Sequence, residues 1–250
     1  MPGHNYYFAS DLHLGTPDAA SSLAREKHFV DWLNRIQPDA RELFLVGDIF
    51  DFWHEYRTAV PRGYTRLLGK LAELSDSGVV LHIFTGNHDL WMDDYLQTEL
   101  QAHIYREPIM RELNGKRFFI GHGDGLGPGD YGYKRIKKIF TNPVCQWLFR
   151  WLHPDVGIRL ANYLSKKSRY GNGSYALEQF QGEENEWLVQ YAKRKLQQQP
   201  VDYFVFGHRH LPLDIAISHN CRYINLGDWL DYCSYAVFDG STMELKYDKP

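Results

Sequence analysis

Aspartate, histidine and asparagine side chains recur in five short segments of this sequence, each directly after a strand-like run. Their carboxylate, imidazole and amide groups can bind a divalent metal ion or transfer a proton. The glycines that come before most of these ligands permit tight turns and a close approach of the backbone. The five segments are Asp11-Leu12-His13, Gly47-Asp48-Ile49-Phe50-Asp51, Gly86-Asn87-His88-Asp89, Gly121-His122-Gly123-Asp124 and Gly207-His208-Arg209-His210.

The elements that must position these segments form an alternating pattern. Helical periodicity over Leu23–Ile36 and Tyr64–Leu74 lies between the early β-rich runs, which predicts an α/β architecture with strands buried between helix layers. The stretch from Tyr223 to Tyr247 has little room for helices and predicts antiparallel strands. A mixed sheet, or two packed sheets, is therefore favoured over a purely parallel one. The β-rich runs are Tyr6–Ser10, Leu43–Val46, Val79–Thr85, Arg117–Ile120, Tyr203–Phe206 and Tyr223–Leu226.

Ligands of α/β sheets bind beyond the carboxyl ends of the strands, so the five segments are expected to converge. Each segment alone is explained by local structure, and it is their conjunction that indicates a site. A donor set without thiolate favours Mn²⁺, Fe²⁺, Mg²⁺ or Zn²⁺. Two such ions roughly 3.5–4 Å apart can clamp a phosphoryl group and activate water for in-line attack on phosphorus. The pattern predicts a metal-dependent hydrolase of phosphate esters or anhydrides.

The composition is that of an ordinary globular chain of 250 residues, with 44% hydrophobic and 24% charged residues. The formal net charge of -3 argues against a protein whose main task is to coat nucleic acid. Its three cysteines lack CxxC spacing, so neither a disulfide framework nor a thiolate zinc site is indicated. The sequence shows no secretory signal and no apolar run near the roughly 18 residues that span a bilayer. We expect a cytoplasmic protein that at most lies against a membrane.

One segment, over approximately residues 125–170, differs from the rest and predicts a helical cap insertion. It opens with a glycine-rich run and becomes basic and aromatic. Its apolar residues recur at helical spacing and form one broad stripe: Phe140, Val144, Trp147, Leu148, Trp151 and Leu152. Basic residues flank the stripe: Arg135, Lys138, Arg150, Arg159, Lys166, Lys167 and Arg169.

Two interpretations of the stripe stay open. It packs against the sheet while the charges are solvated, or it forms an apolar cleft for acyl chains beside cations for a diphosphate. A surface of apolar and basic character also suits a lipid that resides in a membrane.

The order of the five segments resembles that of the calcineurin-like metallophosphoesterases, and the likeness runs from about Asp11 to His210. The resemblance implies one domain over residues 1–250, built as a sandwich of two mixed β-sheets flanked by helices. It implies a first metal ion held by Asp11, His13, Asp48 and His210. It implies a second ion held by Asp48, Asn87, His122 and His208, with Asp48 as the bridge.

The same resemblance assigns catalytic roles next to the metal ligands. His88 stands where the family commonly keeps a histidine that stabilises or protonates the leaving oxygen. Asp89 is expected to orient that imidazole. For Asp51 and Asp124, helix capping or turn formation explains the side chains equally well.

Within the family, the chain resembles the diphosphatases that act on UDP-2,3-diacylglucosamine in lipid A biosynthesis. The likeness lies in the Asp11-Leu12-His13-Leu14 start, in Trp53 just past the second segment, and in the helical insertion. That group cleaves the pyrophosphate to release UMP and an acylated sugar phosphate, usually with Mn²⁺. The resemblance implies a UDP-linked acylated sugar as substrate and contact with the cytoplasmic face of the inner membrane. The expected substrate contacts are Trp53, Lys166, Lys167 and Arg169.

One departure keeps an alternative open. The better-known branch of that group has arginine after the asparagine, where this chain has His88, as is usual in the wider family. A phosphodiesterase or pyrophosphatase acting on a soluble nucleotide or a nucleic acid therefore remains a second hypothesis. A non-catalytic scaffold is a third, but it predicts lost ligands, and every inferred ligand position here holds a competent donor. The sequence indicates no stable nucleic-acid partner and leaves the oligomeric state open.

Overall fold

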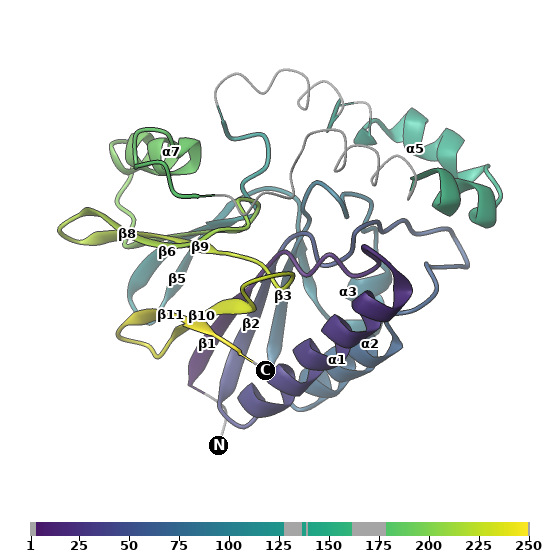
Figure 1. Ribbon diagram of the computed structural model, residues 1–250, viewed down its shortest axis with the longest axis horizontal. Coiled ribbons are helices and arrows are strands. Elements are labelled where there is room, and N and C mark those ends of the chain that lie inside the picture. Colours follow the sequence, from purple (N-terminus) through teal and green to yellow (C-terminus); the bar gives the residue numbers. More distant parts are fainter. Residues whose placement is uncertain (1–3, 128–136, 139, 162–178, 250) are drawn as a thin grey trace.

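Two stacked β-sheets form the body of the protein in the computed structural model, which describes residues 4–127, 137–138, 140–161 and 179–249 (Figure 1). One sheet contains six strands: β1 (Asn5–Ala9), β2 (Ala40–Val46), β3 (Val80–Phe84), β4 (His103–Tyr105), β10 (Ser234–Phe238) and β11 (Met243–Tyr247). The other contains five: β5 (Ile109–Leu113), β6 (Lys116–Gly121), β7 (Tyr203–Phe206), β8 (Pro212–Ser218) and β9 (Cys221–Leu226).

Both sheets are mixed, as the sequence predicts. The first has the strand order β11-β10-β1-β2-β3-β4 and the second has β5-β6-β7-β9-β8. Strands β1 to β4 run parallel, and β10 and β11 join that sheet antiparallel. The prediction of antiparallel strands from Tyr223 to Tyr247 is correct for β10 and β11. It is only half correct for β9, which pairs antiparallel with β8 but parallel with β7.

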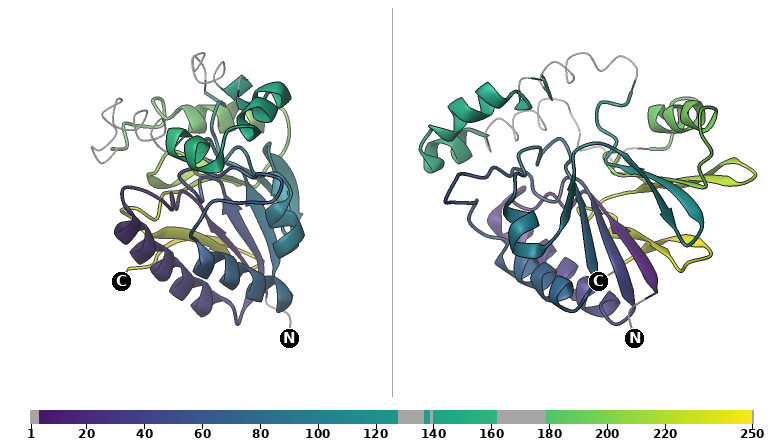
Figure 2. Two further views of the ribbon diagram at one scale, coloured as in Figure 1. Left: turned by 90° about the vertical axis from the view of Figure 1, so that its right-hand side faces the viewer. Right: turned by 180° about the vertical axis from the view of Figure 1, so that it is seen from behind.

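Helices cover the outer face of each sheet (Figures 1 and 2). Helices α1 (Ala19–Ile36), α2 (Thr65–Asp76) and α3 (Tyr95–Leu100) pack on the six-stranded sheet, and α7 (Trp187–Leu196) packs on the five-stranded sheet. Helix α1 begins four residues before the predicted pattern, because Asp18 caps it by accepting hydrogen bonds from the backbone N–H groups of Ala20 and Ser21 at 2.9 Å.

The hydrophobic core has three layers that follow from this arrangement. Side chains such as Phe29 and Leu71 fill the space between the six-stranded sheet and its helices. Between the sheets, Phe44 stacks on Phe8 with ring centroids 4.6 Å apart. Leu188 of α7 packs on the outer face of the five-stranded sheet. Strands β1, β2 and β3 are buried on both faces, which explains their nearly continuous apolar sequences.

The helical insertion lies at the rim where the parallel strands end. Helix α5 (Pro143–Arg150) and helical residues 154–161 stand on one side of this rim, and α7 stands on the other (Figures 1 and 2). Asn142 caps α5 by accepting a hydrogen bond from the backbone N–H of Val144 at 2.9 Å, and Pro143 occupies the first turn. In the part of the chain that the structure describes, no helix is both long and apolar enough to cross a bilayer.

Candidate metal centre

The loops that follow β1, β2 and β7 share an unusual backbone conformation. Five residues that are not glycine have left-handed φ angles there, between 44° and 66°. Such angles are uncommon outside glycine and are found where the surrounding structure enforces them, frequently at functional sites. The five residues are Asp11, His13, Asp48, His208 and His210. Each is a predicted metal ligand, so the strained turns occur at the residues whose side chains form the centre.

Two glycines leave room for these turns. A Cβ atom on Gly207 would lie 2.5 Å from Oδ2 of Asp11, and a Cβ atom on Gly47 would overlap the imidazole of His122. Gly47 also has a φ of +84°, which side chains rarely adopt. Any larger residue at these two positions would therefore displace a predicted ligand.

The first cluster of donors joins the ends of β1 and β7. Asp11, His13 and His210 bring their ligand atoms within 4.8 Å of one another. Nε2 of His13 lies 3.1 Å from Nε2 of His210, which in turn lies 3.2 Å from Oδ1 of Asp11. Both Asp11 and His13 are almost completely buried.

The second cluster joins the ends of β2, β3, β6 and β7. Asp48, His122 and His208 also have ligand atoms within 4.8 Å of one another. Nε2 of His122 lies 3.3 Å from Oδ2 of Asp48 and 3.3 Å from Oδ1 of Asn87. The same Oδ2 of Asp48 is 3.7 Å from Nε2 of His13 in the first cluster. Asp48 therefore stands between the two clusters, where a bridging ligand would have to be.

The donors fit a pair of divalent cations. Oδ1 of Asp11 is buried and faces two imidazole nitrogens, Nε2 of His210 at 3.2 Å and Nε2 of His13 at 3.7 Å. Two imidazole nitrogens, from His13 and His210, face each other at 3.1 Å, an arrangement that requires a proton or a cation between them. Carboxylate, imidazole and amide oxygen suit Mn²⁺, Fe²⁺, Mg²⁺ and Zn²⁺.

A second layer of groups holds the ligands in orientation, as is usual at metal sites. Nδ1 of His122 donates to the carbonyl of Val46 at 2.9 Å, which leaves Nε2 to face Asp48. The backbone N–H of His88 donates to Oδ1 of Asp48 at 2.8 Å. The backbone N–H of His208 donates to Oδ2 of Asp11 at 2.9 Å. Each aspartate thus keeps one oxygen for the backbone and one for the centre.

Sequence reasoning missed one member of this layer. Oδ2 of the buried Asp228 lies 3.4 Å from Nδ1 of His210, on the side of the ring away from Asp11. A signal for it existed, because Gly227-Asp228 follows the strand-like run Tyr223–Leu226 just as Gly47-Asp48 follows the second run.

The buried charges shift one another's pKa values in opposite directions. Burial raises the pKa of Asp48, but the nearby His122 and His88 rings outweigh it and hold the pKa well below its usual range. Burial lowers the pKa of His210, yet the charge and hydrogen bonds of Asp11 and Asp228 raise it to about 10. His208, by contrast, has its pKa lowered to about 4 by burial and by the charge of His122. Without metal ions, the aspartates of the centre are therefore ionised and face the positively charged ring of His210.

The prediction that Asp89 orients the ring of His88 is wrong, because the carboxylate of Asp89 is bound by backbone groups. The carboxylate of Asp89 accepts hydrogen bonds from the backbone N–H groups of Gly86 at 2.7 Å and Ile49 at 2.8 Å. It therefore fastens the loop after β3 to the loop after β2. The carboxylate beside His88 is that of Asp51, whose Oδ1 lies 3.6 Å from Nδ1 of His88. Nδ1 of His88 also donates to the backbone carbonyl of Asp51 at 3.1 Å.

Asp124, for which the sequence suggests a capping or turn role, is largely buried. Its Oδ2 forms an ion pair with Nζ of Lys137 at 2.7 Å. Its charge raises the pKa of the neighbouring His122 in company with those of Asp48 and Asp11. We assign Asp124 to linking the end of β6 to the start of the insertion.

The prediction that Trp53 contacts the substrate is also wrong. Its side chain is fully buried in the core, stacks on Phe50 with centroids 4.3 Å apart, and donates from Nε1 to Oε1 of Glu55 at 2.9 Å. The aromatic ring is therefore needed for packing and has no surface to offer a ligand. Lys166, Lys167 and Arg169 lie outside the described residues, as do Arg135 and part of the expected insertion over residues 125–170.

The apolar stripe of the insertion is exposed, so the interpretation that it packs against the sheet is wrong. Its exposed fractions include 75% for Trp151, 57% for Leu148 and 56% for Trp147. The opposite side of the insertion contacts the body through Phe149, whose ring lies 4.7 Å from that of Trp91 and 4.9 Å from that of His54. Aromatic packing holds one side of the insertion against the body, and the apolar stripe on its other side is exposed to solvent.

A model of the calcineurin-like phosphoesterase family matches residues 4–212 of this chain. A Porphyromonas gingivalis protein named UDP-2,3-diacylglucosamine hydrolase is 43% identical to it over 96% of both chains. One of the same name from Actinobacillus succinogenes is 28% identical over 90% of this chain and 92% of its own. A solved phosphoesterase from E. coli covers 98% of this chain and 93% of its own, at 18% identity and a TM-score of 0.47. That last likeness is too distant to bear on function.

If Asp48 bridges two ions, Asp48→Ala should bind little metal and hydrolyse bis(p-nitrophenyl) phosphate only at background rate, because both ions lose a ligand. Metal content is measured by plasma mass spectrometry after loading with Mn²⁺. The matched control is Asp31→Ala, since Asp31 is exposed on α1. A fully active Asp48→Ala variant would contradict the bridging role.

Metal binding should release protons, because the raised pKa values of His210 and His122 mean that the metal-free rings carry protons which a cation displaces. The apparent affinity for Mn²⁺ should therefore increase as pH rises from about 6 to 8. Calorimetric titration in two buffers of different ionisation enthalpy measures the number of protons. An affinity independent of pH, with no protons released, would show that these imidazoles are not ligands.

Proposed function

The chain belongs to the calcineurin-like phosphoesterase family and is a hydrolase, and on that premise we propose that it hydrolyses the pyrophosphate bond of UDP-2,3-diacylglucosamine to UMP and 2,3-diacylglucosamine 1-phosphate, a step of lipid A biosynthesis. The observation that carries this proposal is the relative of that name with 43% identity over 96% of both chains. A match over nearly the whole length includes the insertion as well as the metal loops.

The exposed insertion supports an acylated substrate. Helix α5 stands at the rim where the parallel strands end (Figure 1). Trp147 and Leu148 of this helix and the adjacent Trp151 present large, exposed apolar side chains. Burying one such side chain against an acyl chain would contribute about 1.5–3 kcal/mol to the free energy of substrate binding. We propose that this surface receives the acyl chains and rests against the cytoplasmic face of the inner membrane, with the protein otherwise in the cytoplasm.

The residues of the centre would hold two divalent ions, and we propose Mn²⁺. Asp11, His13 and His210 would hold the first ion, and Asn87, His122 and His208 the second, with Asp48 shared. Bound there, the ions would supply Lewis-acid polarisation of the phosphoryl oxygens and a lowered pKa for water. The protein's own part is orientation, because each aspartate is held by a backbone N–H and each loop by a strained turn.

We propose that His88 acts on the leaving oxygen. Its Nδ1 donates to the carbonyl of Asp51 at 3.1 Å, which fixes the orientation of the ring beside the metal loops. The side chain is 18% exposed, whereas that of His13 is 1% exposed, which fits contact with a bound substrate rather than with the interior. Oδ1 of Asp51 lies 3.6 Å from the same Nδ1 and helps to hold the ring in this orientation.

His88→Ala should keep its full complement of metal while losing about 10²–10⁴-fold in kcat, the usual contribution of a general acid. Metal content and hydrolysis of UDP-2,3-diacylglucosamine are measured on the same preparation. The control is His219→Ala, because His219 is exposed in the turn between β8 and β9. Loss of metal from His88→Ala would mean that His88 is a ligand instead.

The proposed activity is tested by incubating the purified protein and Mn²⁺ with UDP-2,3-diacylglucosamine in mixed micelles and measuring UMP. We expect rapid release that stops with chelator, and little turnover of UDP-N-acetylglucosamine, which carries only an acetyl group and lacks the long acyl chains. No release of UMP, together with cleavage of bis(p-nitrophenyl) phosphate, would refute the lipid substrate and favour the soluble-nucleotide hypothesis.

A matched pair of variants separates the insertion from the metal centre in this assay. Trp151→Ser should raise KM for the lipid substrate about tenfold, because it removes apolar surface from the acyl site. Val80→Ser changes an exposed apolar residue of β3 and should leave KM unchanged.

A further inference from the structure

A hollow adjoins the metal centre on the side of the rim opposite to α5. It has a volume of about 410 Å³, within the range of small-molecule sites. The residues that line it are Gln179, Gln181, Asn185, Glu186, Trp187, His208 and Arg209. One of them, His208, also belongs to the Asp48 cluster, so whatever occupies the hollow lies directly beside that cluster.

The wall of the hollow is built around a buried ion pair. Glu186 is only 2% exposed, and its two carboxylate oxygens accept hydrogen bonds from Nε of Arg209 at 2.9 Å and from Nη2 at 3.1 Å. This bidentate pair joins the start of α7 to the metal loop after β7. The side chain of Asn185 donates to the backbone carbonyl of Gln181 at 2.9 Å and holds the preceding turn.

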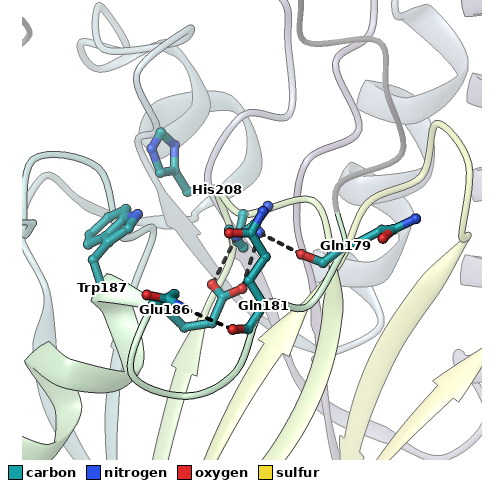
Figure 3. A pocket seen from close by; sticks show the side chains of 7 residues that line it. Gln179, Gln181, Glu186, Trp187 and His208 are labelled. Atoms are coloured by element: carbon teal, nitrogen blue, oxygen red, sulfur yellow. Dashed lines mark hydrogen bonds and ion pairs between the residues drawn. The ribbon is translucent and has the colours of Figure 1, made fainter.

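The hollow is lined by an aromatic ring and by carboxamide side chains. The ring of Trp187 meets that of His208 edge-on at 5.9 Å. Figure 3 shows Trp187, His208 and Gln181 around one space, with Gln179 on its far side. Aliphatic side chains are lacking from the lining residues, whereas the insertion across the rim carries several exposed ones.

This combination suits a pyrimidine nucleoside. An aromatic ring provides a stacking surface for a base, and a carboxamide can both donate to and accept from the edge of uracil. A substrate with a nucleoside on one side of a pyrophosphate and acyl chains on the other needs two unlike surfaces that flank the metal ions. The polar hollow and the apolar insertion are two such surfaces.

We infer that this hollow binds the uridine half of the substrate, with the base on Trp187, Gln181 at its hydrogen-bonding edge, and the α-phosphate toward His208. The inference rests on the proposed function and extends it to the selection of the nucleotide. Trp187 and Gln181 then determine specificity, and Arg209 and Glu186 are positioning residues that keep α7 against the metal loop.

The test compares the binding of UMP with that of ribose 5-phosphate, which lacks the base, to the Mn²⁺-loaded protein by calorimetry. Both ligands reach the metal ions through phosphate, so the ratio of their dissociation constants reports on the base alone. We expect UMP to bind about thirtyfold more tightly than ribose 5-phosphate, the product of about tenfold from base stacking and about threefold from one hydrogen bond. In Trp187→Ala the ratio should fall to about three or less, and in Trp187→Phe it should be largely restored.

Gln181→Ala should lower the same ratio about threefold, through the loss of a hydrogen bond. The matched control, Gln198→Ala, changes an exposed residue beyond the far end of α7 and should leave the ratio unchanged. Equal binding of UMP and ribose 5-phosphate by the unmodified protein, or an undiminished ratio in Trp187→Ala, would overturn the inference.

Failure of this inference is distinguishable from failure of the proposed function. Release of UMP from UDP-2,3-diacylglucosamine without a preference for UMP over ribose 5-phosphate refutes the uridine site alone. A preference for UMP that depends on Trp187, without hydrolysis of the lipid, supports the site and refutes the lipid substrate.

Discussion

Three aspartates buried almost side by side are the constraint on which this structure depends. Asp11, Asp48 and Asp89 are each at most 1% exposed. An isolated buried carboxylate is very costly, so each must be compensated by donors or positive charge. The compensation differs: Asp89 is held by backbone N–H groups, while Asp11 and Asp48 each keep one oxygen for imidazoles. The raised pKa of Asp89, about 7, reflects its burial and the charge of Asp48. For the other two, the proposed pair of divalent cations would complete the balance.

Meeting that constraint shapes the backbone around the centre. Five of the predicted ligand residues adopt left-handed φ angles, which cost of order 1–3 kcal/mol each in residues other than glycine. The two stacked sheets tolerate this cost because β1, β2 and β7 are buried, paired strands that hold the ends of each loop. Rigid strands with strained loops at one edge give a centre whose ligands are oriented before any ion binds.

The surroundings of the centre divide the rim into two unlike sides. Aromatic packing of Phe149 on Trp91 and His54 fixes one side of the insertion and turns its apolar stripe outward. Across the rim, the Glu186–Arg209 pair holds the start of α7 beside His208 and leaves a polar hollow. The proposed substrate, with an apolar end and a polar end, matches such a division, and the proposed metal ions would lie where its two ends join.

The sequence by itself determined the family, the alternation of elements and the set of polar side chains that the structure brings together, because donors at strand ends leave a local pattern of apolar run, glycine and polar residue. That pattern was enough to bring segments up to 199 positions apart, from Asp11 to His210, into one predicted site. Only the tertiary structure decided which neighbours those ligands have. Asp51 rather than Asp89 lies beside His88, Asp228 supports His210, and Trp53 packs in the core. The reason is physical: hydrogen-bond partners and exposure depend on how loops from different strands fold over one another, which spacing along the chain does not encode.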